Sequence, residues 1–385
     1  MYLSRKERDR RYERLRERMV EEELSVLLVI GNNHATGSPF FATGNFRYLT
    51  DYFIFTLYGM LLFFREGNPI LLAPGEIVEV YGKRHSWIDD VRVSLNYADT
   101  VAQVLERNGL IRSRVGFLGM ESIPASTYLA LREKLPNAEF VDASSILLPL
   151  RFVKSEEERK LMEKAAELND GGYKELLKRI YPGMKEFEVV GILEGYHRGN
   201  GADRTFNLIS SGPFPASREG TPFQGLPWFP SQREIQKGDS VLLEMTNVYG
   251  GYWNQLVRTV SVGGENSELL RFQKAAVKTI QSGLEGMKVG TKTSQIVSSM
   301  AETLEKCGFH LTTPMGHFVG IDLIEGRVDF QSPVVLAPGM ATILHPRVSD
   351  PKTGVNSILW GQTYFMTDSG PVKLNQTEED VLHCV

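Results

Sequence analysis

The chain has 385 residues, of which 42% are hydrophobic and 23% charged; this composition excludes a disordered protein and supplies enough apolar surface for two domains. A formal net charge of −4 gives no concentrated basic surface, so we expect no nucleic-acid partner. No apolar run is long enough to span a bilayer, and we expect no membrane partner. The two cysteines, Cys307 and Cys384, are too few for a disulfide framework, which favours a cytoplasmic location.

The first part of the chain alternates between helical and strand-like patterns. Residues 5–24 mix both signs of charge with apolar residues at helical spacing, which predicts a helix with one solvated face. Further helices are predicted at 100–110 and 126–135. Short aliphatic runs bounded by Gly, Pro and Asn predict strands, at residues 25–30, 58–65, 69–74 and 115–120. We therefore predict a small α/β domain over residues 1–150.

The pattern changes near Lys154. Ser155 and Glu158 have the spacing of a capping box ahead of a long helix, so a second domain is predicted over residues 151–385. Two of its stretches, 181–201 and 285–309, each combine a Gly-Met-Lys turn with an amphipathic helix that ends at glycine. Strand patterns follow each stretch, at 241–249, 252–262, 341–348 and 362–374. We predict two related α+β halves around a sheet, with a site where the halves meet.

Several segments together resemble the creatinase, aminopeptidase P and prolidase family, which has the pita-bread fold. The segments are, in chain order, GNFRYLTDYF at 44–53, the junction at 150–168, the hairpin at 235–263, MGHFVGIDLIEG at 315–326, LAPGMATILHP at 336–346 and GQTYFMTDSGPVKL at 361–374. The resemblance implies an α+β protein with a C-terminal pita-bread domain after a smaller N-terminal creatinase-like α/β domain. It also implies a peptidase M24-like hydrolase that forms a homodimer, with the neighbour's N-terminal domain at the cleft.

Metal-dependent members of this family hold two divalent ions with two Asp, one His and two Glu. The two Asp positions match Glu244 and Gln255, and the His matches His317. The first Glu matches His345, and the last falls at or beside Gly361. Four of the five positions have changed. Glu244 supplies the only carboxylate among them, and its single negative charge cannot compensate two dications. The resemblance therefore implies a divergent member with no two-metal centre and no required cofactor.

The other residue sets of the family are also missing. The accessory histidines of the peptidases match Thr313 and Ile324. A glutamate characteristic of creatinase matches Val257, and the region of the catalytic histidine of creatinase matches Trp228-Phe229.

Glu244, His317 and His345 are predicted as the catalytic residues, since the implied fold brings their three strands to one cleft. A carboxylate and two imidazoles can transfer protons near neutral pH, with Glu244 orienting a histidine or the substrate. The same three residues have the composition of a single divalent metal site. His345 is equally compatible with a hydrogen-bonded core residue. These alternatives stay open.

Substrate-binding residues are predicted on and around the hairpin. Gln255 and Asn254 can donate and accept hydrogen bonds and suit an amide or carboxylate substrate. Arg47 of a neighbouring subunit could meet a carboxylate bidentately. Aromatic faces could hold an ammonium group; the candidates are Trp253, Trp228 and Phe229.

The preferred hypothesis is a metal-independent, creatinase-like enzyme. It would act on a small polar amino, amide or guanidino compound by C–N hydrolysis or a lyase step, with His317 and His345 sharing the proton transfer. The first alternative is an inactive, peptidase-like protein that binds a peptide or protein partner, which the Pro- and aromatic-rich loop at 212–230 favours. The second alternative is an Xaa-Pro dipeptidase or aminopeptidase.

Overall fold

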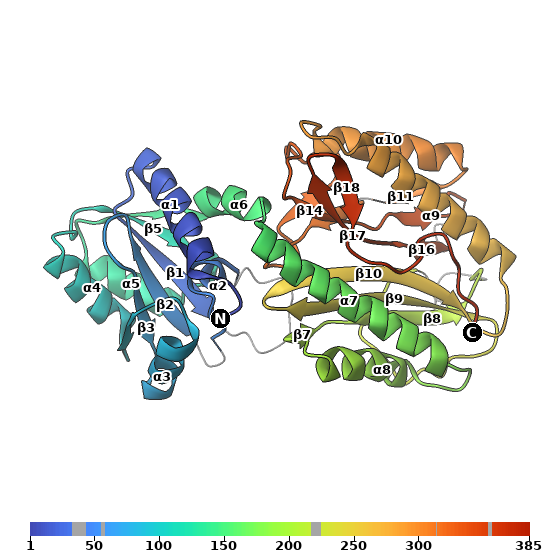
Figure 1. The fold of residues 1–385 in the computed structure, drawn as a ribbon, viewed down its shortest axis with the longest axis horizontal. Coiled ribbons are helices and arrows are strands. Elements are labelled where there is room, and N and C mark those ends of the chain that lie inside the picture. The colour runs from blue at the N-terminus through green and yellow to red at the C-terminus, as the bar shows by residue number, and fades with distance from the viewer. Residues whose placement is uncertain (33–43, 55–57, 217–224, 313, 353–355) are drawn as a thin grey trace. The chain divides into compact units, whose positions relative to one another are not determined.

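The computed structural model describes the chain except residues 33–43, 55–57, 217–224, 313 and 353–355. Thr313 and part of the loop at 212–230 therefore lie outside the described residues. The chain forms two compact units, Met1–Arg151 and Phe152–Val385 (Figure 1). In the described ranges no helix is both long and apolar enough to cross a membrane.

The first unit is an α/β domain built on a six-stranded sheet with the order β4-β3-β2-β1-β5-β6. Its central strand β1 is antiparallel to β2 and parallel to β5. The strands are β1 (Val26–Asn32), β2 (Tyr58–Phe64), β3 (Ile70–Ala73), β4 (Asp90–Val93), β5 (Arg114–Leu118) and β6 (Glu139–Asp142). The helices are α1 (Arg5–Glu21), α2 (Gly44–Thr50), α3 (Glu76–His85), α4 (Tyr97–Arg107), α5 (Ala125–Lys134) and α6 (Ser144–Phe152), with a 3-10 turn at Met120–Ser122.

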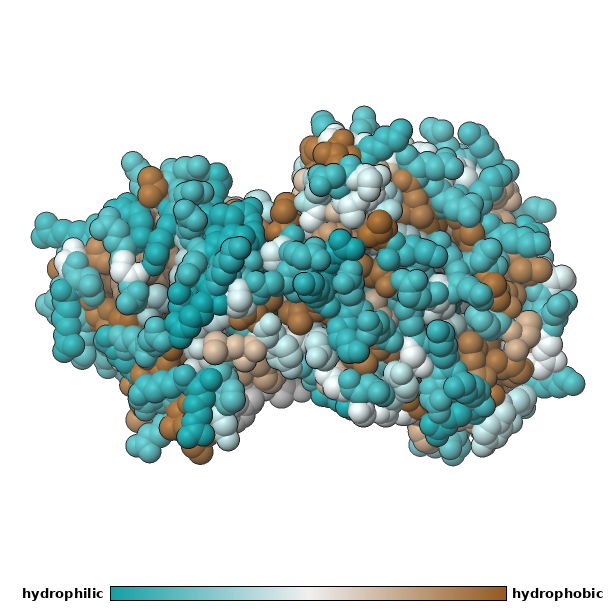
Figure 2. All heavy atoms as spheres, in the orientation of Figure 1, coloured by the Kyte–Doolittle hydropathy of each residue, from teal (hydrophilic) through white to brown (hydrophobic). Residues whose placement is uncertain are grey.

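Helix α1 has the exposed charged face that its sequence predicts, and on its other side it buries a cation as well as apolar residues. Leu15 and Met19 are buried, and so is Arg11. The Arg11 guanidinium pairs with Glu7 at 2.7 Å and donates to the Tyr48 carbonyl at 2.7 Å. A buried cation needs such partners, because an unpaired charge away from water is costly. The exposed charges of α1 still give this part of the surface its largely hydrophilic character (Figure 2).

The second unit contains a nine-stranded sheet, in which the order is β13-β12-β14-β17-β10-β9-β7, with β18 paired to β17 and β8 paired to β9. A small sheet has the order β11-β15-β16. The first strands are β7 (Arg204–Thr205), β8 (Leu208–Pro213), β9 (Asp239–Tyr249) and β10 (Tyr252–Ser261). The later ones are β11 (His310–Thr312), β12 (Gly316–Phe318), β13 (Gly326–Val328), β14 (Ala341–Leu344), β15 (Arg347–Ser349), β16 (Ser357–Leu359), β17 (Gly361–Thr367) and β18 (Gly370–Lys373).

The four helices in the described part of the second unit are α7 (Glu156–Arg179), α8 (Glu186–Gly199), α9 (Ser267–Gly286) and α10 (Thr293–Lys306). Three of them, α7, α8 and α10, begin at the predicted signals, whereas α9 was not predicted. The capping box of α7 is confirmed, because Ser155 Oγ accepts from the Glu158 amide at 3.3 Å and Glu158 Oε2 accepts from the Ser155 amide at 2.8 Å. The helices of the two similar stretches also start alike: the Lys185 and Lys292 amides donate to side chains three residues later, and both residues form isolated bridges.

Replacing Ser155 with alanine tests this cap. Ser155→Ala is expected to lower the free energy of unfolding by about 1 kcal/mol, since an amide at the start of α7 loses its acceptor. Urea unfolding followed by circular dichroism measures the change. Ser155→Thr keeps the hydroxyl and should recover most of the loss; equal losses in both variants would contradict the role of the cap.

The strands β9 and β10 form the predicted hairpin around Tyr249-Gly250-Gly251. Gly250 and Gly251 have φ values of 60° and 90°, and this left-handed pair is what a two-residue turn between twisted strands requires. The turn fixes the register, in which Thr246 lies opposite Gln255 and Glu244 lies opposite Val257. Helix α7 runs along this hairpin (Figure 1).

Candidate active site

The β9–β10 hairpin separates its polar residues between two faces of the sheet. Asn247 Nδ2 donates to a backbone carbonyl of α7 at 2.9 Å, and Asn254 Oδ1 accepts from a side chain of α7 at 2.7 Å. Because neighbouring residues of a strand point to opposite faces, Glu244 and Gln255 lie on the other face, together with Thr246. We call this side of the nine-stranded sheet the site face.

The register extends the site face to His317. Cross-strand partners share a face, and so do residues two apart in one strand. The series of same-face residues runs from Gln255 through Val257, Gly361, Thr363 and Ile343 to His317. Two of the predicted catalytic residues, Glu244 and His317, are therefore on the same face, as the sequence predicts.

His345 joins His317 at the end of β14. The two ring centroids are 5.3 Å apart with an interplanar angle of 69°, and the His345 amide donates to the Met315 carbonyl at 2.8 Å. Burial lowers the pKa of His317 to about 3, with a further lowering from His345. Burial likewise lowers the pKa of His345 to about 4. Both imidazoles are consequently neutral near pH 7 and act as hydrogen-bonding groups in the free protein.

Glu244 is the member of this trio that titrates near neutrality. Its register neighbours are Leu208 of β8 and Val257 of β10, both apolar. Burial raises the pKa of Glu244 to about 7, because the carboxylate loses hydration that these neighbours do not replace. Within the part of the chain that the structure describes, no hydrogen-bond donor meets its carboxylate. The group is thus available to a ligand and to proton transfer.

Gln255 adds a second acceptor to the site face. Its Nε2 donates to Thr246 Oγ1 at 3.3 Å, and its backbone amide donates to Thr363 Oγ1 at 3.2 Å. Gln255 Oε1 is buried and lacks a donor among the described residues. A buried acceptor without a partner carries a desolvation cost, so a ligand with an N–H or O–H group would be favoured here. Trp253 lies two residues before Gln255, on the same face, and is mostly buried.

Asn254 does not belong to the site, and its predicted role in substrate binding is wrong on this geometry. Its side chain lies on the helix face, where Oδ1 accepts from Asn169 at 2.7 Å and Nδ2 donates to Asn375 Oδ1 at 3.1 Å. The residue is fully buried. It therefore holds α7 and the C-terminal segment to β10.

Adjacent residues 254 and 255 make a matched pair for mutagenesis. Asn254→Ala is expected to lower the free energy of unfolding by about 1–3 kcal/mol, because Asn169 and Asn375 lose a buried partner, and to leave the KM of an identified substrate unchanged. Gln255→Leu is expected to raise that KM with a smaller effect on stability. Urea unfolding and steady-state kinetics of both variants measure these effects; a KM that rises only in Asn254→Ala would reverse the assignment of faces.

An aromatic group flanks Glu244 at the edge of the sheet. Trp228 forms a bridge with Ile209, which places Phe229 beside Leu208 and on the site face. The Phe229 ring lies edge-on to Phe206 at 6.1 Å and to Trp228 at 5.5 Å. Trp228 and Phe229 are exposed. Phe206 was not identified from the sequence, although its spacing of two from Leu208 is the alternation that marks a shared face.

The fifth metal-ligand position is closed by backbone. A Cβ at Gly361 would lie 1.8 Å from the Leu344 carbonyl oxygen and 2.7 Å from His345 Cα, so no side chain fits there. Arg258 Nη1 also donates to the Gly361 carbonyl at 2.7 Å and fixes this part of β17. Arg258 is fully buried and has a structural role.

The donor set does not fit two divalent ions. Of the five family positions only Glu244 carries a carboxylate, and one negative charge leaves two dications largely uncompensated. Across the described residues, no three His, Cys, Asp or Glu side chains are grouped so that they could hold a metal ion. The trio Glu244, His317 and His345 is therefore not assembled as a single-metal site either.

Arg47 lies in the first unit, in a pocket described below. Its predicted contact with the substrate of a neighbouring subunit stays a prediction.

Comparison with known proteins defines the family. The model of the Creatinase/Prolidase N-terminal domain matches residues 11–153, and that of Metallopeptidase family M24 matches residues 160–368, more than half of the chain. The chain belongs to metallopeptidase family M24. The M24 member from Pyrococcus horikoshii named Xaa-Pro dipeptidase is 27% identical over 271 residues, which cover 69% of this chain and 74% of that protein. The ectoine hydrolase of Halomonas elongata is 27% identical over 291 residues, covering 69% of this chain and 71% of that protein.

Solved structures confirm the fold of this M24 protein. The Xaa-Pro dipeptidase from Bacillus anthracis superposes with a TM-score of 0.82 at 23% identity, covering 98% of this chain and all (100%) of that chain. The prolidase from Pyrococcus horikoshii OT3 gives a TM-score of 0.82 at 24% identity over 97% and 100% of the two chains. The predicted α+β architecture, an N-terminal creatinase-like domain and a C-terminal pita-bread domain, is thus confirmed, and the named relatives are hydrolases.

Proposed function

We propose that this M24 protein hydrolyses a C–N bond in a small polar amino, amide or guanidino compound, without a two-metal centre. One observation carries the proposal: at the family's metal position a carboxyl group, Glu244, lies between the apolar register neighbours Leu208 and Val257, and burial raises its pKa to about 7. A carboxyl group with this pKa is half ionised at neutral pH, so it can both accept and donate a proton during one turnover.

The proposed reaction balances with water as the only co-reactant. Ionised Glu244 takes a proton from a water molecule while the oxygen of that water forms a bond to the substrate carbon. The C–N bond then breaks, and protonated Glu244 returns the proton to the departing nitrogen. The products are an acid or its equivalent and an amine. The neutral rings of His317 and His345, 5.3 Å apart, would hold the polarised oxygen or the water by hydrogen bonds.

The acceptors of the site face favour a substrate that donates hydrogen bonds. Gln255 Oε1 is buried and lacks a donor within the described ranges. Glu244 is its diagonal neighbour across the β9–β10 pair, which places their Cβ atoms roughly 7 Å apart. An amino, amidino or guanidino group can satisfy both at once. The rings of Phe206 and Phe229 would add cation–π attraction for a charged form.

The similarity to named peptidases favours a second candidate, hydrolysis of Xaa-Pro dipeptides. Relatives named Xaa-Pro dipeptidase from two Pyrococcus species are 27% and 26% identical over 69% of the chain. The peptide bond of such a substrate is itself a C–N amide bond, so the two candidates differ in substrate and in metal requirement. Of the activities named by the relatives, this one is the first to test.

A substrate panel tested with and without chelator separates the candidates. The panel contains Xaa-Pro dipeptides, ectoine and a guanidino acid such as creatine, each assayed with EDTA and with added Mn²⁺ or Zn²⁺, while mass spectrometry measures bound metal. Turnover that EDTA leaves unchanged supports the proposal. Turnover of Xaa-Pro dipeptides only after metal is added establishes the second candidate and overturns metal independence. No turnover of any compound, with a peptide or protein captured instead, establishes the inactive binding protein.

A further inference from the structure

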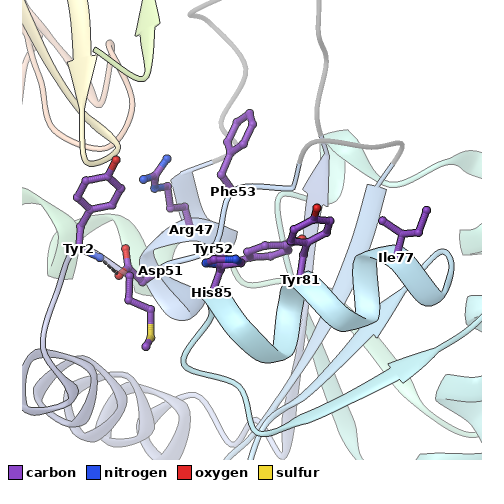
Figure 3. A pocket seen from close by; sticks show the side chains of 9 residues that line it. Tyr2, Arg47, Asp51, Tyr52, Phe53, Ile77, Tyr81 and His85 are labelled. Atoms are coloured by element: carbon purple, nitrogen blue, oxygen red, sulfur yellow. Dashed lines mark hydrogen bonds between the residues drawn. The ribbon is translucent and has the colours of Figure 1, made fainter. Parts of the chain in front are cut away.

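The first unit contains a pocket that the proposed catalytic function does not use. It has a volume of 570 Å³, within the usual range for sites that bind small molecules. Three segments build it: the N-terminal residues, the stretch from the end of α2 to residue 53, and helix α3. The pocket is lined by Met1, Tyr2, Arg47, Asp51, Tyr52, Phe53, Ile77, Tyr81 and His85 (Figure 3).

One wall is an apolar and aromatic stripe of α3. Ile77, Tyr81 and His85 are spaced by four residues, which places them on one face of the helix. The Tyr81 and His85 rings stack at 5.8 Å with an interplanar angle of 26°. Ile77 is 67% exposed and Tyr81 43% exposed. Contiguous exposed apolar groups on a surface helix are uncommon and indicate a binding surface.

The opposite wall carries the pocket's fixed cation. Asp51, which has a φ of 49°, accepts from the Tyr2 and Leu3 amides at 2.6 and 3.1 Å. These bonds pin the N-terminal segment against the pocket. Burial raises the pKa of Asp51, and the charge of the nearby Arg47 partly offsets this rise, so the Asp51 carboxylate also faces the guanidinium. The Arg47 guanidinium carbon lies 5.7 Å from the centroid of the Tyr2 ring. Figure 3 shows the Arg47 and Phe53 side chains projecting from this wall.

A buried hydroxyl in the pocket lacks a partner. Tyr52 is 4% exposed, and its hydroxyl has no hydrogen-bond partner within the described part of the chain. Burial raises the pKa of Tyr52 to about 12, so the group keeps its proton and remains a donor. A buried donor without an acceptor is unfavourable. An acceptor atom on a ligand would remove this cost.

We propose that this pocket binds a small heteroaromatic carboxylate. The Arg47 guanidinium holds the carboxylate, the Tyr52 hydroxyl donates to a ring nitrogen, and the ring lies against Phe53, Ile77 and Tyr81. The charge is complementary, because a guanidinium matches a carboxylate in shape and sign. All residues that line the pocket belong to the first unit. The test measures binding and not turnover, so its failure can be distinguished from failure of the catalytic proposal.

Binding of a small compound panel to the full chain tests the proposal. The probes are quinoline carboxylates, the corresponding naphthoates, which lack the ring nitrogen, and quinoline, which lacks the carboxylate; isothermal titration calorimetry measures the Kd values. Quinoline carboxylates are expected to bind roughly 5- to 10-fold more tightly than naphthoates, as one hydrogen bond contributes. They should bind at least about 10-fold more tightly than quinoline, because a charged pair contributes more.

Two substitutions assign these preferences to their residues. Tyr52→Phe should abolish the preference for quinoline carboxylates over naphthoates, and Arg47→Gln should abolish the preference for carboxylates over quinoline. Tyr52→Phe should leave the Tm unchanged or raise it, because the hydroxyl has no partner to lose. Tyr97→Phe is the matched control in the same unit: its hydroxyl donates to the Tyr58 carbonyl at 2.7 Å, so this variant should lower the Tm without changing the Kd.

Three results would overturn the proposal. The first is equal affinity for all three probe classes, and the second is no binding below about 1 mM. The third is a Tm loss in Tyr52→Phe as large as that in Tyr97→Phe, which would mean that the hydroxyl is already satisfied in the free protein.

Discussion

Glu244→Gln is expected to lower kcat/KM for the compound that the protein hydrolyses by about 100- to 10,000-fold, the usual contribution of a general acid–base group. Glutamine keeps the size and hydrogen-bonding oxygen of the side chain but has no transferable carboxyl proton. In the wild-type protein, kcat/KM should change with an inflection near pH 7, which follows from the raised pKa of Glu244. Steady-state kinetics over a range of about two pH units on either side of the transition measure both effects.

The stability of the same variant gives an independent readout. The pKa of Glu244 is raised from 4.5 to about 7, so the folded state binds this proton more tightly than the unfolded state. The burial penalty is therefore absent below the unfolded pKa, grows as the pH rises between the two values, and is complete above the folded pKa. Relative to wild type, Glu244→Gln should be more stable at pH 8 and similar in stability below the unfolded pKa.

A surface carboxylate provides the control. Glu268 of α9 pairs with Arg271 at 2.6 Å in an exposed position, and Glu268→Gln should leave both kcat/KM and its pH profile unchanged. An unchanged kcat/KM in Glu244→Gln would remove Glu244 from the mechanism. A variant that is less active and also less stable at pH 8 would indicate structural damage instead.

The hairpin shows which part of the site can be read from sequence. The two apolar strand patterns on either side of Tyr249-Gly250-Gly251 predict both strands and the turn, and the register then places Gln255 opposite Thr246. The same period of two separates Asn254 from Gln255. Predicting both residues for one site neglected this rule, and the structure corrects it through the contact of Asn254 with Asn169.

Other features of the site depend on contacts between distant strands. His317 and His345 meet because β12 pairs with β14, and no local pattern encodes that pairing. The closure at Gly361 likewise depends on the approach of the Leu344 carbonyl. The pKa values follow from burial, which only the assembled sheet defines. In the first unit, the pocket combines α3 with the N-terminal residues, and neither was predicted as a binding element.

A buried ion pair close to the site gives the largest expected effect on stability. Lys154 Nζ lies 2.7 Å from Glu325 Oε2, and both side chains are 1% exposed. The Lys154 amide also donates to the Gly339 carbonyl at 2.8 Å, and the Glu325 amide donates to the Phe318 carbonyl at 2.9 Å. Phe318 follows His317 directly, so the pair braces the turn after β12.

Lys154→Met is expected to lower the free energy of unfolding by about 3–5 kcal/mol, since it leaves the Glu325 carboxylate buried without its cation. Glu325→Leu should cost a similar amount for the converse reason. The double variant should lose less than the sum of the two single losses, because it leaves no unpaired charge. Urea unfolding of the three variants and wild type completes this double-mutant cycle.

An exposed ion pair with the same N–O distance tests whether burial, and not distance, determines the loss of stability. Lys164 Nζ and Glu167 Oε2 are also 2.7 Å apart, but their side chains are 45% and 64% exposed. Lys164→Met should therefore cost less than about 1 kcal/mol. Similar losses at both pairs would mean that burial does not determine the effect. The Lys154–Glu325 pair is joined to β12 through the hydrogen bond from the Glu325 amide to the Phe318 carbonyl. If this pair also positions His317, the NMR resonances of the His317 imidazole should shift in Lys154→Met. They should stay unchanged in Lys164→Met.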